Sequence, residues 1–111
     1  MLNQVVVVGR LIEEPITEKV SDTETKGSIL LAIPRSYKNE NGEYETDYLP
    51  CTLMNKISEN VVEYCHKSDL LGIKGRLVSN VEEDEQGNKQ YSIKIIAEKV
   101  TFLASKKDDG E

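Results

Sequence analysis

Tyrosines and basic side chains gather around one predicted turn in the middle of the chain. Tyr37 precedes an Asn-Gly step at 41–42, and Tyr44 and Tyr48 follow it. Asn-Gly favours a tight turn between antiparallel strands, so the stretch 29–56 predicts a long β-hairpin that carries these rings. Bases stack on flat rings and phosphates attract cations, so this hairpin is typical of a protein that binds single-stranded nucleic acid.

Six basic residues are the candidates for contacts with phosphate, and each has the alternative of being a solvated surface side chain. Three of them flank the tyrosines: Arg35, Lys38 and Lys56. The other three lie on strands predicted elsewhere in the chain: Arg10, Lys74 and Arg76. The tyrosines also have an alternative, which is to pack against a neighbouring strand or subunit.

The patterns of catalytic and metal-binding sites are absent from the sequence. His66 is the only histidine, and Cys51 and Cys65 are too far apart to form a C-x-x-C motif, so a zinc site lacks ligands. There is no Ser/His/Asp set and no glycine loop of the kind that holds phosphate. We therefore expect no enzyme, no metal and no cofactor, and interpret the cysteines as small apolar residues kept reduced.

Length and composition limit the class of protein. The chain has 111 residues, which is enough for one domain, and 38% of them are hydrophobic. It has no apolar run long enough to cross a bilayer and no secretory signal, so we expect a cytoplasmic protein.

The charge argues against a nucleic-acid partner. Twenty acidic residues against 14 basic ones give a net charge of −6 and a pI near 4.9, whereas nucleic-acid binders usually carry excess basic charge. Binding to nucleic acid would therefore depend on where the cations are placed.

Alternation and turn residues predict six strands and one helix. The strands are expected at 3–12, 16–20, 28–37, 43–54, 69–81 and 91–103, and the helix at 57–67. Gly9 predicts a bulge or bend, and Pro34 predicts an edge or a bulge. The pattern predicts an all-β fold, a five-stranded OB-fold barrel with one short α-helix between strands and protruding β-hairpins. This domain would span 1–104, with a short charged tail at 105–111 that we expect to be disordered.

The sequence resembles the bacterial single-stranded DNA-binding protein family over residues 1–104. No single motif carries the resemblance, which depends on the order and spacing of many short matches. They lie at 2–11, 13–15, 31–33, 37–39, 42–43, 47–48, 55–56, 59–61, 75–77, 86–87, Tyr91 and 97–98.

The resemblance implies an OB-fold that binds single-stranded DNA with little sequence preference, in replication, recombination or repair, without catalysis. It also implies a nucleoid-associated homo-oligomer, a tetramer or a dimer. Tyr37 and Tyr48 occupy two positions at which the family stacks rings on bases. Met54 occupies a third such position, and Glu82 occupies a fourth, within the acidic run 82–85. That run should repel phosphate.

The family's long linker and its acidic, hydrophobic tip are absent from the given sequence, so we do not expect partners to be recruited through such a tip. Two interpretations stay open: a shortened piece of a longer protein, or a specialised copy from a mobile element or a competence system. A further alternative, favoured by the acidic charge, is an OB-fold protein-interaction module with weak or lost DNA binding.

Overall fold

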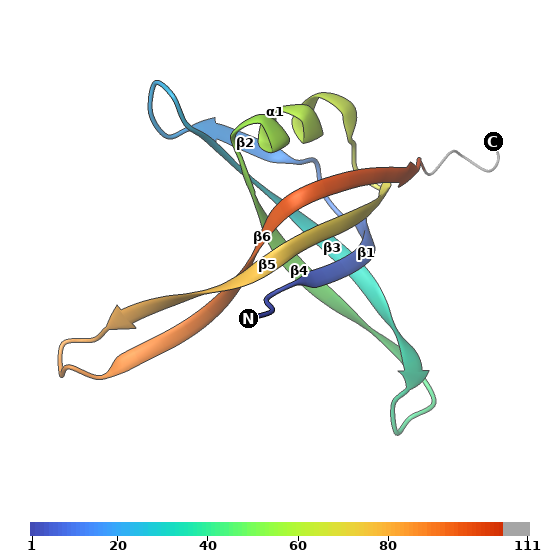
Figure 1. Ribbon diagram of the computed structural model, residues 1–111. Coiled ribbons are helices and arrows are strands. Elements are labelled where there is room, and N and C mark those ends of the chain that lie inside the picture. Colours follow the sequence, from blue (N-terminus) through green and yellow to red (C-terminus); the bar gives the residue numbers. More distant parts are fainter. Residues whose placement is uncertain (106–111) are drawn as a thin grey trace.

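The computed structural model describes residues 1–105 and consists mainly of strands that close into a barrel (Figure 1). The tail predicted at 105–111 lies outside the described residues, apart from Ser105. The elements are β1 (Val5–Leu11), β2 (Ile16–Lys19), β3 (Thr25–Lys38), β4 (Tyr44–Met54), α1 (Asn55–Tyr64), β5 (Leu70–Glu83) and β6 (Lys89–Ala104).

Five strands pair in the order β1-β5-β6-β4-β3, and a short pairing of β1 with β3 closes the circle. This closing pairing joins Arg10 to Ala32 and Leu11 to Leu31. All neighbouring strands are antiparallel except β4 and β6, and β2 adds an extra strand on the outer edge of β3. The predicted five-stranded barrel of OB type, with one helix and protruding hairpins, is confirmed.

Alternate residues of the strands fill the barrel, since successive side chains of a strand point to opposite faces. The buried core also receives Val61 from α1 and Cys65, which follows it. The two cysteines are free, and burial raises the pKa of the Cys51 thiol to about 11. The apolar core consists of Leu11, Ile29, Leu31, Cys51, Leu53, Val61, Cys65, Leu71, Ile73, Ile95 and Ala97.

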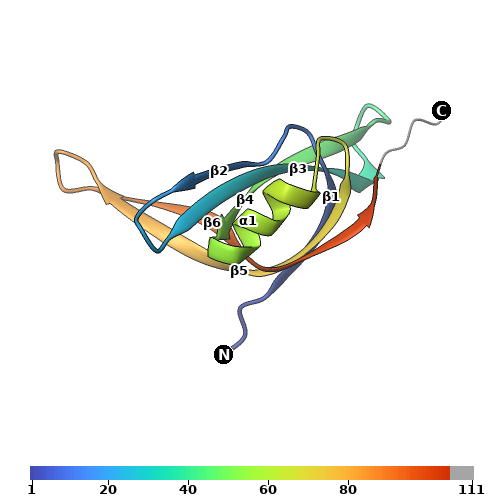
Figure 2. The same cartoon turned by 90° about the horizontal axis from the view of Figure 1, so that it is seen from above.

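Helix α1 lies across one end of the barrel, between β3 on one side and β6 on the other (Figure 2). It begins two residues before the predicted start, at Asn55, which has a positive φ of 51° and whose Oδ1 accepts the N–H of Thr25. It ends three residues before the predicted end because Cys65 is already extended and packs into the core. Within residues 1–105, this helix is too short and too polar to cross a membrane.

Glycine and proline have different consequences in the strands. Of the bulge or bend predicted at Gly9, the bulge is absent, since β1 pairs with β5 without a register shift there, and the bend stays a prediction. A Cβ at Gly9 would lie 2.8 Å from the Ala32 carbonyl oxygen, so glycine permits the close approach of β3 at the closing pairing. The irregularity predicted at Pro34 is confirmed, because the β3–β4 register shifts between Pro34 and Lys38.

Two long hairpins extend from the end of the barrel opposite α1 and diverge (Figure 1). We call residues 32–48 the β3–β4 arm and residues 77–95 the β5–β6 arm. Each arm has two faces, one continuous with the outside of the barrel and one continuous with its interior. These faces position the candidate site.

Candidate nucleic-acid interface

Strand β4 presents one row of uncharged side chains to the outside. Cys51 and Leu53 are buried, and successive side chains of a strand point to opposite faces. The even-numbered residues of β4 therefore point outward, and Tyr48 among them is 58% exposed. The outward row consists of Tyr44, Thr46, Tyr48, Pro50, Thr52 and Met54.

Strand β3 continues this surface without adding an acid. The register pairs Ala32 with Tyr48 and Lys26 with Met54, so the even-numbered residues of β3 share the outward face. They are Lys26, Ser28, Leu30, Ala32 and Pro34. We call these outward residues of the two strands the β3–β4 outer face. Although the chain has 20 acidic residues, none of them occupies this face of β3 and β4, both of which the structure describes in full.

The two acids of β4, Glu45 and Asp47, occupy the opposite face of the β3–β4 arm, and Arg35 binds both. Its Nη2 lies 2.8 Å from Asp47 Oδ1 and its Nη1 lies 2.9 Å from Glu45 Oε1. Hydrogen bonds from Arg35 lower the pKa of Asp47, and those same bonds raise the pKa of Arg35. Arg35, a predicted phosphate contact, is therefore held by carboxylates of its own arm.

Tyr48 and Arg10 meet in a groove of about 410 Å³ on the outside of the barrel. Arg10 is exposed and lies on β1 opposite Ala32, and Ala32 pairs with Tyr48 on its other side. Arg10 Nη1 donates to the Ser68 carbonyl oxygen over 2.9 Å, which fixes the guanidinium at the edge of the groove. Its lining is mostly apolar: Val8, Gly9, Arg10, Ile12, Ala32, Pro34, Thr46, Tyr48 and Leu70. An exposed ring beside an arginine in an apolar groove is suited to hold a base and its phosphate.

The structure does not bring Tyr37 to the face that carries Tyr48. Lys38 pairs with Tyr44, and its Nζ lies 5.8 Å from the centre of that ring, which places Lys38 on the Tyr44 face. By alternation, the preceding residue Tyr37 lies on the Arg35 face, and Tyr37 contributes to the raised pKa of Arg35. Tyr37 is 63% exposed, so a stacking role for this ring stays a prediction.

Met54 and Lys56 lie at the far end of β4, where the strand passes into α1. Met54 is half-buried and pairs with Lys26, whereas Lys56 is exposed on the helix. Lys26 is not among the predicted contacts, because it lies between the strands predicted at 16–20 and 28–37. Lys94 is not among them either, although the alternation of Ile93 and Ile95 could have placed Lys94 on the outside, next to the pairing of Thr52 with Ile96.

Lys74 and Arg76 are on β5, which β6 and β1 separate from the strands of the outer face. Lys74 is exposed, and Arg76 Nη1 lies 3.1 Å from Glu98 Oε2. The structure therefore does not place these two predicted contacts beside Tyr48.

The β5–β6 arm differs from the β3–β4 arm because it has an acidic tip and an exposed apolar face. Its tip carries Glu82, Glu83, Asp84 and Glu85, all exposed. The face continuous with the barrel interior pairs Val81 with Tyr91 and Ser79 with Ile93. Tyr91 is 69% exposed and Ile93 is 70% exposed, so this apolar face is open to solvent in the single chain.

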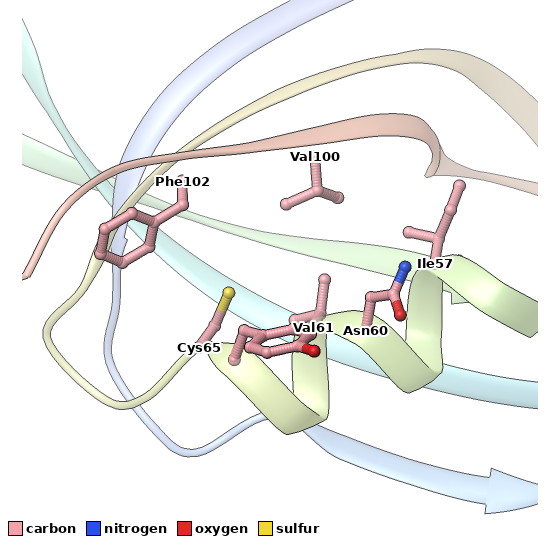
Figure 3. A pocket seen from close by; sticks show the side chains of 7 residues that line it. Ile57, Asn60, Val61, Cys65, Val100 and Phe102 are labelled. Atoms are coloured by element: carbon pink, nitrogen blue, oxygen red, sulfur yellow. The ribbon is translucent and has the colours of Figure 1, made fainter.

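A second hollow, of about 230 Å³, lies between α1 and β6 (Figure 3). Val100 and Phe102 reach into it from β6, while Ile57, Asn60 and Val61 line it from the helix. It contains none of the predicted site residues, and Asn60 and Tyr64 are the lining residues with polar side-chain groups. Within residues 1–105 there is no cluster of three or more His, Cys, Asp or Glu side chains that could hold a metal ion.

Comparison with known proteins identifies relatives along nearly the whole chain. Residues 2–103 match the single-strand binding protein family. The chain is 40% identical to single-stranded DNA-binding protein B of Bacillus subtilis over 106 residues, covering 96% of this chain and 94% of the relative. It is 35% identical over 111 residues to single-stranded DNA-binding protein 1 of Lactococcus lactis, covering 100% and 74%. It is 33% identical to single-stranded DNA-binding protein 1 of Clostridium acetobutylicum, covering 96% and 98%.

Proposed function

Since this chain belongs to the single-strand binding protein family, we propose that it binds single-stranded DNA along the β3–β4 outer face. One observation carries the proposal: a chain with net charge −6 keeps every acid off this face, and places Tyr48 and Arg10 in its groove. Phosphate repulsion is lowest on such a surface, although the molecule as a whole is negative.

In this mechanism, bases stack on Tyr48, and a thioether contact to Met54 follows farther along β4. Lys26 on the outer face, Arg10 and Lys38 beside it, and Lys56 at the start of α1 follow the backbone of the bound DNA. Tyr37 contacts the DNA only where the bound DNA passes around the edge of the β3–β4 arm to the other face. Stacking accepts any base, so sequence preference is weak, as protection of DNA during replication, recombination or repair requires.

We also propose that the chain associates with itself, as a dimer or tetramer, through the apolar face of the β5–β6 arm. Val81, Tyr91 and Ile93 are too exposed there for a face that stays in water. This surface is separate from the β3–β4 outer face, so self-association leaves the DNA path open.

The alternative is a protein-interaction module whose acidic surface binds a basic partner. The acids at the tip of the β5–β6 arm favour this alternative, whereas the absence of acids from the outer face opposes it.

A titration of a labelled poly-dT oligonucleotide, followed by quenching of tyrosine fluorescence, tests the proposed function. We expect saturable binding at low salt, which weakens with a slope of about −0.7 in log K against log salt for each phosphate neutralised. Replacing both Tyr37 and Tyr48 by Ala should remove most of the affinity while the circular dichroism spectrum stays unchanged. Absence of binding by the wild-type chain at low salt would favour the protein-interaction module, and full binding by the double variant would refute the stacking mechanism.

A further inference from the structure

Each of the three nitrogens of the Arg35 guanidinium donates to a carboxylate on one face of the β3–β4 arm. Nε donates to both carboxylate oxygens of Asp47, over 3.2 and 3.1 Å, and Nη2 donates to Oδ1 over 2.8 Å. Nη1 donates to Glu45 Oε1 over 2.9 Å. A planar fork held by two carboxylates has lost the orientation it would need to reach a phosphate on the outer face.

These bonds continue to the tip of the arm. Glu45 Oε2 accepts Asn39 Nδ2 over 3.0 Å, and Asn39 Oδ1 accepts the N–H groups of Asn41 and Glu43 over 2.9 and 3.0 Å. The network therefore runs along the part of the arm where the β3–β4 register shifts, between Pro34 and Lys38. Side-chain bonds stabilise the arm where the backbone pairing is irregular.

The same contacts remove charge next to the proposed DNA path. Glu45 follows Tyr44 and Asp47 precedes Tyr48, so both carboxylates lie one residue from an outward ring. Without Arg35, two unpaired negative charges would lie on the thin arm and repel phosphate.

We infer that Arg35 is a positioning residue: it orders the β3–β4 arm and offsets one of the two negative charges of Glu45 and Asp47, and it does not contact phosphate itself. This inference rests on the proposed DNA binding of the outer face. It replaces the direct phosphate contact that the sequence predicts for Arg35.

Three variants separate the two roles: Arg35→Ala, the triple variant Arg35→Ala with Glu45→Gln and Asp47→Asn, and Lys38→Ala. Lys38 lies on the same arm, and within residues 1–105 it forms no ion pair, so Lys38→Ala is the matched loss of one cation. Affinity for the poly-dT oligonucleotide is measured from 50 to 300 mM salt.

Arg35→Ala should weaken binding by about five- to tenfold at low salt, and the triple variant, which has no charge at these three positions, should keep at least about half of the wild-type affinity. The triple variant should keep the wild-type salt slope, whereas Lys38→Ala should reduce the slope by about 0.7. A triple variant whose slope falls as that of Lys38→Ala does would show that Arg35 neutralises a phosphate, and would overturn the inference.

Amide hydrogen exchange without DNA tests the ordering role independently. Arg35→Ala should speed exchange at residues 36–47 and leave the β5–β6 arm unchanged, and unchanged exchange in both arms would contradict the ordering role. A wild-type chain that binds no DNA overturns the proposed function, while the exchange experiment still reports whether Arg35 orders the arm.

Discussion

The two arms of this protein are built on the same turn, yet they present opposite kinds of surface. At one tip Asn39 Oδ1 accepts the N–H groups of Asn41 and Glu43, and Gly42 has a φ of 79°. At the other tip Asp84 Oδ1 accepts the N–H groups of Gln86 and Asn88, and Gly87 has a φ of 83°.

The faces behind these turns differ. In each arm, the face that is continuous with the barrel interior extends into solvent. On this face of the β3–β4 arm Arg35 forms its ion pairs, whereas on this face of the β5–β6 arm Tyr91 and Ile93 are exposed to solvent. The outward residues of β3 and β4 include no acid, although Glu40 and Glu43 are exposed at the tip of that arm, whereas the tip of the second arm carries four consecutive acids. The turn therefore sets the shape of a hairpin, and the side chains on its strands decide what it can bind.

The largest expected effect separates two exposed tyrosines, one on each arm. Tyr48→Ala should weaken poly-dT binding by about 5- to 150-fold, because one stacked base contributes about 1–3 kcal/mol. Tyr91→Ala on the other arm removes a ring of similar exposure, 69% against 58%, and should change affinity by less than about twofold. Affinity is measured by fluorescence anisotropy. Equal losses of affinity in the two variants would show that DNA binding depends on the exposure of a tyrosine and not on the arm that carries it.

The next effect concerns self-association. Val81→Thr with Ile93→Thr keeps β-branched residues in the strands but removes apolar surface, so the dissociation constant between chains should rise by about tenfold or more. Light scattering over a range of protein concentrations measures this change, and Tyr44→Thr on the other arm is the control that should keep the wild-type mass. A wild-type chain that is monomeric at all concentrations would refute the proposed interface.

A smaller effect is expected from the acidic tip. Replacing Glu82, Glu83 and Glu85 by Gln, while keeping Asp84 for the turn, should tighten DNA binding by about three- to tenfold at low salt, because phosphate is no longer repelled. The gain should disappear as salt increases. The control variant replaces Glu13, Glu24 and Glu63 by Gln. It changes the net charge by the same amount at positions outside both arms, and it should affect DNA affinity less. Unchanged affinity in the tip variant would show that the acidic tip does not weaken DNA binding.

The smallest effect distinguishes the two turns by pH. Backbone hydrogen bonds, that of Asn88 above all, lower the pKa of Asp84, so its contribution to the turn is complete above the ordinary carboxyl pKa. That contribution is lost as the pH falls through the lowered value, below about 4. Amide shifts of Gln86 and Asn88 should therefore change between pH 5 and about 2.5, while those of Asn41 and Glu43, bound to neutral Asn39, should change less. In Asp84→Asn the difference between the two turns should disappear.

Much of the fold follows from local pattern. The buried positions Cys51 and Leu53 fix the outward direction of Tyr48, and the Asn-Gly step at 41–42 fixes the turn, so both are predictable from the sequence. The family resemblance, which the comparisons confirm, supplied the nature of the ligand.

The rest of the site depends on features that no local pattern encodes. Tyr37 and Tyr48 take opposite faces because Ala32, not an odd-numbered residue of β3, pairs with Tyr48 across the hairpin, and Arg35 is held by partners 10 and 12 residues away across the arm. Lys26 belongs to the outer face only because β3 begins at Thr25, inside a stretch rich in turn formers.

The most direct test of the central claim is to map amide shifts of the ¹⁵N-labelled chain as a poly-dT oligonucleotide is added. Our account predicts that the largest changes fall on residues 26–34 and 44–54 and on Arg10, with little change at the β5–β6 turn. Changes concentrated on Tyr91 and Ile93, or on the hollow between α1 and β6, would contradict it.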